Sequence, residues 1–180
     1  MKKRILSLLI LLSAATATMA YNSILAKLVK TDYEGKADSL TKVFIKEFMN
    51  TSKGTFWVTP KGVNSSNTYI YWQQAHAIDV VIYAYHRNLA AGNKTRANLY
   101  KNHVSKWFQN NGNNYSGGST GFENPYTDDM CWIALTLQRM GEVFNNNTYF
   151  STAKKLFDNG IMSRAKEDEK GLWLPWNTDN

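Results

Sequence analysis

Apolar residues recur at helical spacing along most of the chain, and five segments are long enough to form helices. These expected helices cover about residues 37–49, 72–91, 94–109, 127–144 and 148–162. No segment shows a pattern of alternating apolar and polar residues that competes with this interpretation. The pattern therefore predicts an all-α fold.

The five segments differ in how much of their circumference is apolar. In the second and fourth, apolar residues lie on nearly every side, which indicates helices surrounded by other parts of a protein. The first, third and fifth carry their apolar residues in one stripe, with charged residues elsewhere. This order predicts an alternation of outer and inner helices.

Long connections precede both surrounded helices, and short connections follow them. Residues 50–71 and 110–126 are the two long connections, and residues 163–180 form a third long segment after the last helix. If neighbouring helices run antiparallel, all three segments lie at the end where the inner helices begin. Loops longer than about 15 residues are usually functional, so this end is the expected site. Two inner helices also need more neighbours than three outer helices provide, which predicts one portion of a larger α/α assembly.

The N-terminus has the pattern of a secretion signal. Basic residues 2–4 precede an apolar run over residues 5–15, and Thr18-Met19-Ala20 offers a small-residue cleavage site. We expect residues 1–20 to be removed, which makes Tyr21 the first mature residue. The apolar run is shorter than a membrane-spanning helix, so no membrane span is expected after cleavage. The expected location is the periplasm or the outside of the cell.

Charge and composition argue against several other classes of protein. The formal net charge of +7 falls to +4 (7 − 3) when the signal with Lys2, Lys3 and Arg4 is removed. The remaining basic residues are mixed with acidic ones, which is not typical of a nucleic-acid-binding surface. Cys131 is the only cysteine, which excludes an internal disulfide. The three histidines show no metal-ligand spacing, and no metal or other cofactor is expected.

Asp128 and Asp129 are adjacent carboxylates at the expected start of the second inner helix. Thr127 is the expected N-cap, which would place both acids in the first turn, where the helix dipole favours negative charge. Acidic residues at a helix start are common, so a purely structural explanation stays open. The other explanation is a retaining glycosidase, which needs two carboxyl groups about 5–5.5 Å apart, one nucleophilic and one a proton donor. Burial and a neighbouring charge would raise the pKa of the donor.

Aromatic residues in and beside the long loops suit the apolar faces of sugars, and asparagine and glutamine suit sugar hydroxyls. For Trp72, packing at a helix start is as good an explanation as stacking on a sugar. Trp57 lies in a loop and can either stack on a sugar or hold its loop in place. Trp132, inside an apolar helix, is expected in the core, and Asp79 is expected to make a buried structural hydrogen bond.

Two segments resemble the signature segments of glycoside hydrolase family 76, the endo-α-1,6-mannanases. They are Tyr-Trp-Gln-Gln-Ala-His-Ala-Ile-Asp at residues 71–79 and Asn-Pro-Tyr-Thr-Asp-Asp-Met-Cys-Trp-Ile-Ala-Leu at residues 124–135. The resemblance covers essentially all of residues 21–180, but only about the first half of the family's domain. That family folds as an (α/α)6 toroid. The resemblance therefore implies that residues 21–180 are the N-terminal portion of such a domain.

The resemblance also implies a function, the hydrolysis of α-1,6-mannan with retention of configuration. It implies that Asp128 is the nucleophile and Asp129 the acid/base. An oligosaccharide or polysaccharide is then the expected partner. The residues expected to bind this substrate are Trp72, Gln73, Asn124 and Tyr126 at the helix ends, together with the loop residue Trp57.

Two alternatives stay open. The first is a non-catalytic glycan-binding protein that keeps the aromatic groove. The second is a non-functional fragment that does not fold alone. If the polypeptide ends at Asn180, weak or absent hydrolysis is expected, because half a toroid leaves the groove open and lacks distal sugar-binding residues.

Overall fold

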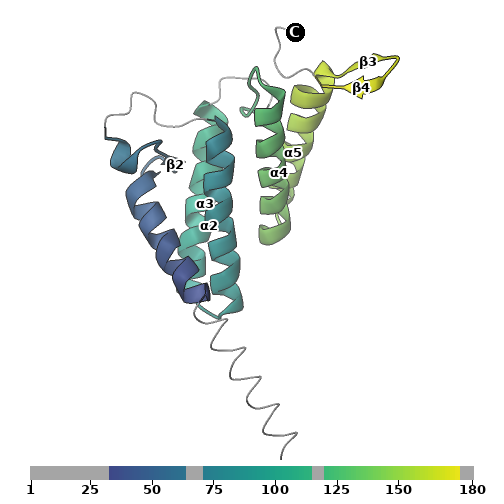
Figure 1. Ribbon diagram of the computed structural model, residues 1–180. Coiled ribbons are helices and arrows are strands. Elements are labelled where there is room, and N and C mark those ends of the chain that lie inside the picture. Colours follow the sequence, from purple (N-terminus) through teal and green to yellow (C-terminus); the bar gives the residue numbers. More distant parts are fainter. Residues whose placement is uncertain (1–32, 64–70, 115–119, 175–180) are drawn as a thin grey trace, which may run out of the picture. The chain divides into compact units, whose positions relative to one another are not determined.

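The computed structural model describes residues 33–63, 71–114 and 120–174 (Figure 1). The expected signal peptide over residues 1–20 lies outside the described residues. Contacts divide the chain into two units, Met1–Leu40 and Thr41–Asn180. Residues 33–40 of the first unit are helical, and so are residues 41–48 of the second. All the numbered helices and strands belong to the second unit.

Helices α2 (Tyr71–Ala90) and α3 (Lys94–Asn114) run antiparallel and pack against each other (Figure 1). The expected α2 is confirmed to within one residue at each end. The expected end of α3 at residue 109 is wrong, because the helix continues to Asn114 through a stretch rich in asparagine. One cause is a tertiary contact: the side-chain amide of Asn110 donates to the carbonyl oxygen of Lys53. Such contacts override the weak helix propensity of the local sequence.

Helices α4 (Thr127–Phe144) and α5 (Asn147–Lys155) form a second antiparallel pair. Asn145 adopts the left-handed conformation, with φ of 48°, and ends α4. The side chain of Asn146 then accepts a hydrogen bond of 2.9 Å from the N–H of Thr148 and caps α5. The short turn expected between these helices is confirmed.

Beyond α5 the backbone stays helical but changes its winding. A π-helical turn, η2 (Leu156–Ile161), leads into a 3-10 turn, η3 (Met162–Arg164). Helical backbone therefore covers the expected range 148–162, although not as one α-helix. The wide turn packs tightly on α4, since a Cβ atom at Gly160 would lie 3.0 Å from the sulfur of Met130.

Two short antiparallel hairpins, which the hydrophobic pattern did not indicate, lie among the helices. The strands are β1 (Met49–Asn50) with β2 (Thr55–Phe56), and β3 (Lys166–Asp168) with β4 (Gly171–Trp173). A single 3-10 turn, η1 (Pro60–Gly62), follows β2. Strands of two or three residues are too short to show an alternating pattern, so hydrophobic periodicity does not predict them. The all-α fold class is nevertheless confirmed.

The core lies where α2 packs against α3 and α4, and where α4 packs against α5. Its largest fully buried side chains include Ile78, Ile82, Tyr100, Trp107, Met130, Ile133, Leu137 and Leu156. Helices α2 and α4 run in the same direction, so both begin at the same end of the unit (Figure 1). The alternation of outer and inner helices is therefore confirmed.

One side of each inner helix is apolar and exposed. On α2 this side carries Trp72, Val80 and Tyr83, and on α4 it carries Trp132 and Leu135. These side chains are only partly covered by other described residues, although the sequence pattern predicted helices surrounded on all sides. Exposed apolar faces of this kind are what inner helices of a larger α/α assembly present. None of the described helices combines the length and apolar character needed to cross a bilayer.

Candidate active site

The acidic pair lies in the first turn of α4, as expected. The cap is different from the prediction, because Tyr126 is the N-cap residue and Thr127 is already helical. Thr127 is buried, and its hydroxyl oxygen has no hydrogen-bond partner among the described residues. The predicted N-cap role of Thr127 is therefore wrong. Its side chain faces the core instead of the open backbone amides.

Asn124 joins the loop before α4 to the acidic pair. Its side-chain oxygen accepts a hydrogen bond of 2.9 Å from the N–H of Tyr126. Its amide nitrogen donates to the carboxylate of Asp129 over 2.9 Å. Two of the predicted site residues, Asn124 and Tyr126, are thereby brought to the acids.

The two carboxyl groups of the pair have different surroundings. Asp128 is exposed, whereas Asp129 is half-buried. Burial raises the pKa of Asp129, the hydrogen bond from Asn124 opposes that rise, and the charge of Asp128 adds to it. A carboxyl group with a raised pKa keeps its proton to higher pH, as a general acid must.

Tyr71, the first residue of α2, is buried beneath the acidic pair and was not predicted as a site residue. Its hydroxyl group donates to the carbonyl oxygen of Phe122, which fixes the loop before α4 to α2. Burial raises the pKa of Tyr71 strongly, and the negative charges of Asp129 and Glu123 add to the rise. Its position at the start of the 71–79 segment was the one signal that the sequence offered.

A row of rings extends from the acidic pair along the exposed face shared by α2 and α4. The rings of His76 and Trp132 lie 4.7 Å apart, and His76 meets the edge of Trp72 at 5.7 Å. Trp132 is 45% exposed, so its predicted place in the core is wrong. Trp132 follows Asp128 by four residues, and this helical spacing puts both on one face of α4. The spacing was the available signal for an aromatic surface beside the acids.

The same face continues into an ion pair. Arg139 of α4 contacts the carboxylate of Asp79 on α2, and its guanidinium group lies 5.6 Å from the ring centre of Tyr83. The predicted structural hydrogen bond of Asp79 is confirmed, and its partner belongs to the other inner helix. The pair fixes α2 and α4 to each other below the aromatic row.

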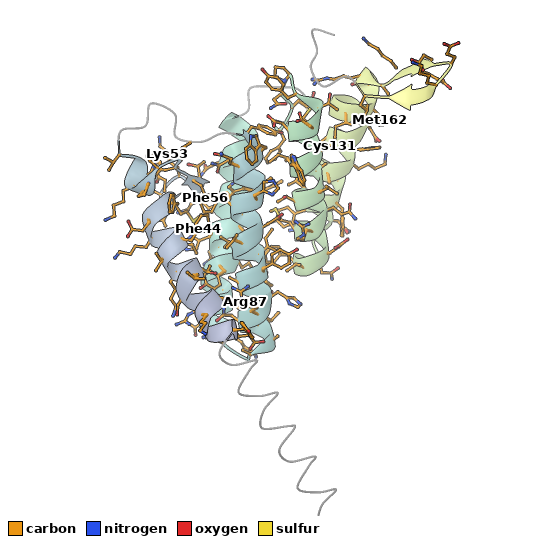
Figure 2. All side chains as sticks on the ribbon, in the orientation of Figure 1. Phe44, Lys53, Phe56, Arg87, Cys131 and Met162 are labelled. Carbon is orange, nitrogen blue, oxygen red and sulfur yellow. The ribbon has the colours of Figure 1, made fainter. Side chains whose placement is uncertain are left out.

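A hollow of about 440 Å³ lies beside the start of α2. Three predicted substrate-binding residues line it, namely Trp57, Trp72 and Gln73. Phe44 and Phe56 form part of its apolar wall, with their ring centres 5.3 Å apart (Figure 2). Trp72 and His76 belong both to this hollow and to the aromatic row, so the two features adjoin.

The predicted site residues therefore fall into two groups. Asn124 and Tyr126 accompany the acidic pair, whereas the other three line the hollow beside α2. Among the described residues, no group of three or more histidine, cysteine or acidic side chains is arranged to hold a metal ion.

No protein-family model and no curated protein matches the chain. A solved structure does match it, an α-1,6-mannanase of Salegentibacter sp. HEL1_6 in complex with α-1,6-mannotriose. The sequence identity is 26% and the TM-score 0.60, and the match covers 82% of this chain and 39% of the mannanase chain. That mannanase is an inactive variant in which two consecutive aspartates are replaced by asparagine.

The structural match agrees with the two sequence segments that resemble glycoside hydrolase family 76. This chain corresponds to less than half of the length of the mannanase that it matches. The resemblance to glycoside hydrolase family 76 is therefore confirmed, and the alternating helices of this chain form part of an α/α toroid.

Proposed function

We propose that this chain carries the acidic pair of a glycoside hydrolase that cleaves α-1,6-mannan with retention of configuration. Asp128 is the nucleophile in this proposal, and Asp129 is the acid/base. The observation that carries it is the contrast within the pair. An exposed carboxylate adjoins a half-buried one that accepts a hydrogen bond from Asn124.

The contrast suits a two-step displacement. In the first step the carboxylate of Asp128 attacks the anomeric carbon, and Asp129 gives its proton to the departing glycosidic oxygen. A covalent glycosyl ester forms on Asp128 as the glycosidic bond breaks. In the second step Asp129 removes a proton from water, which attacks the same carbon and releases Asp128. The raised pKa of Asp129 favours the protonated form that the first step requires.

The similar mannanase supports the choice of substrate and of residues. It is an α-1,6-mannanase bound to α-1,6-mannotriose, and replacement of two consecutive aspartates accompanies its inactivity. Asp128 and Asp129 are the only consecutive aspartates in this chain. Trp132 is exposed one helical turn after Asp128, and Trp72 is exposed at the other end of the aromatic row, so both offer aromatic faces to sugar rings.

The test is the release of reducing ends from linear α-1,6-mannan. Wherever the wild-type protein releases reducing ends at a measurable rate, we expect a loss of at least about a thousandfold in Asp128→Asn, because no nucleophile remains. Asp158→Asn, which changes an exposed carboxylate on η2, is the matched control and should keep full activity. Equal, measurable rates in the wild type and Asp128→Asn would show that Asp128 is not the nucleophile and would contradict the proposed site.

A second candidate function is glycan binding without turnover. It is favoured by the extent of the match, since this chain corresponds to 39% of the mannanase chain. Calorimetric titration with α-1,6-mannotriose distinguishes the two functions. Binding that persists in a chain without measurable hydrolysis would support this candidate, and binding lost in Trp72→Ala would locate it.

We also propose that the protein is exported, on the basis of the signal pattern in residues 1–20. Expression in a bacterial host followed by mass measurement of the secreted product tests this proposal. The expected mature N-terminus is Tyr21. Retention of Met1 in the recovered protein would contradict it.

A further inference from the structure

Both ends of the Asn124 side chain are occupied, and neither is directed to solvent alone. The amide oxygen accepts from the N–H of Tyr126, and the amide nitrogen donates to Asp129, each over 2.9 Å. This arrangement fixes the orientation of the amide. A flipped amide would place its NH2 group against the N–H of Tyr126 and its oxygen against the carboxylate of Asp129, so both contacts would be lost.

The backbone around Asn124 is itself held on both sides. Two residues before it, the carbonyl oxygen of Phe122 accepts the buried hydroxyl group of Tyr71. One residue after it, the carbonyl oxygen of Pro125 accepts a hydrogen bond of 3.1 Å from Arg164. Asn124 is therefore presented to Asp129 from a loop fixed to α2 on one side and to η3 on the other.

The charged groups around Asp129 come from several elements. Asp128 precedes it on α4, and Glu123 belongs to the loop. Tyr71 from α2 interacts electrostatically with Asp129, Glu123 and Arg164. Beside these charged groups, the neutral side chain of Asn124 donates a hydrogen bond to the Asp129 carboxylate.

We propose that Asn124 is a positioning residue, whose amide holds the Asp129 carboxylate in place for its role as acid/base. This inference rests on the proposed function and assigns Asn124 to the acid rather than to the sugar. The same side chain also holds the chain at the start of α4, because its oxygen accepts the N–H of the N-cap residue Tyr126. One residue thus connects the start of the helix to the reacting group.

The donor and the acceptor of Asn124 can be separated by two substitutions. Asn124→Ala removes both hydrogen bonds, whereas Asn124→Asp keeps an acceptor for Tyr126 and replaces the donor with a negative charge. Loss of the donor destabilises the ionised form of Asp129. We therefore expect the Asp129 titration, followed by carboxyl carbon NMR, to move to higher pH in Asn124→Ala and further still in Asn124→Asp.

Asn146 provides the matched control, since it caps α5 through an equal hydrogen bond of 2.9 Å to a backbone N–H. Asn146→Ala and Asn146→Asp should leave the Asp129 titration where it is in the wild type. An unchanged midpoint in Asn124→Ala, with the melt showing a folded protein, would overturn the proposal. So would an equal shift in Asn146→Ala.

Kinetics provide a second readout wherever mannan hydrolysis is measurable. We expect kcat to fall about tenfold or more in Asn124→Ala with little change in KM, because a misplaced acid slows the chemical step. The alkaline limb of the pH profile should move to higher pH together with the NMR midpoint. A rise in KM at unchanged kcat would instead make Asn124 a substrate ligand and overturn the proposal. The NMR result does not depend on turnover, so failure of the proposed hydrolase and failure of this inference remain distinguishable.

Discussion

The side chain of Gln74 is hydrogen-bonded to both backbone polar groups of Phe56. Its oxygen accepts from the N–H of Phe56 and its nitrogen donates to the carbonyl oxygen, each over 2.9 Å. Gln74 is only 1% exposed, so these bonds are buried. Its amide completes the pairing of β2 as a further strand would, and it fixes the hairpin before Trp57 to α2.

Replacement of Gln74 by leucine should therefore destabilise the protein. Gln74→Leu keeps a side chain of similar size but removes the amide, which leaves the N–H and the carbonyl group of Phe56 buried without a partner. Each such group costs about 1–3 kcal/mol, so we expect a loss of about 2–6 kcal/mol in the free energy of unfolding. Urea denaturation followed by circular dichroism measures it.

The neighbouring Gln73 is the matched control for this experiment. It has the same side chain, lies one residue earlier on α2 and faces the hollow. Gln73→Leu should change stability by no more than about 0.5 kcal/mol. If the two variants had equal stability, the hydrogen bonds of Gln74 would not hold the hairpin.

Trp132 is an exposed aromatic residue and Trp107 a core residue, so their replacement by alanine should have different effects on stability. Trp107 is fully buried, so Trp107→Ala should cost about 3–5 kcal/mol of stability. Trp132 is 45% exposed, so Trp132→Ala should cost about 1 kcal/mol or less. In calorimetry, Trp132→Ala should also bind α-1,6-mannotriose more weakly than the wild type. A large loss of stability in Trp132→Ala would show that Trp132 packs in the core.

The helices could be predicted from the sequence because each repeats its apolar pattern over several turns. Their environment could not be predicted equally well. The apolar residues around Trp132 indicated burial, but which side of an inner helix is covered depends on elements that lie elsewhere in space. Trp132 is exposed for that reason, while Ile133, the next residue, is fully buried.

The acidic pair could be located from the sequence, but the way it is held could not. Threonine is one of the residue types preferred at helix N-caps, so the local sequence alone favours Thr127 for this role. The structure gives the connection to Asn124, three residues earlier, because the loop turns back on the helix start. The contact of Tyr71 with Phe122 spans 51 residues, and no local pattern reports such a contact.

Gly54 in the β1–β2 turn cannot accept a side chain. Its φ is 79°, and a Cβ atom there would lie 2.8 Å from backbone atoms of Lys106 and Trp107. We expect Gly54→Ala to cost about 3 kcal/mol or more, from backbone strain together with displacement of α3. Gly92 has a similar φ of 77° with nothing within 4 Å, so Gly92→Ala should cost only about 1 kcal/mol. Equal losses by thermal melting would show that the close approach to α3 contributes nothing.

Asp129 should make stability depend on pH in a defined direction. Because burial raises its pKa, the folded protein binds this proton more tightly than the unfolded chain does. The contribution of Asp129 to stability is therefore greatest below the unfolded pKa of about 3.9, and it is lost as pH rises through the higher pKa of the folded state. Asp129→Asn removes the charge and should be more stable than the wild type at pH 7.

The comparison of urea midpoints at pH 3 and pH 7 measures this effect. The advantage of Asp129→Asn should disappear at pH 3, where the wild-type carboxyl group is protonated in both states. Asp128→Asn is the matched variant, because it relieves the repulsion between the two acids and leaves Asp129 half-buried. Its gain at pH 7 should be smaller. If the wild type were as stable as Asp129→Asn at pH 7, the folded protein would not destabilise the ionised form of Asp129. The proposed acid/base role of Asp129 would then have no electrostatic support.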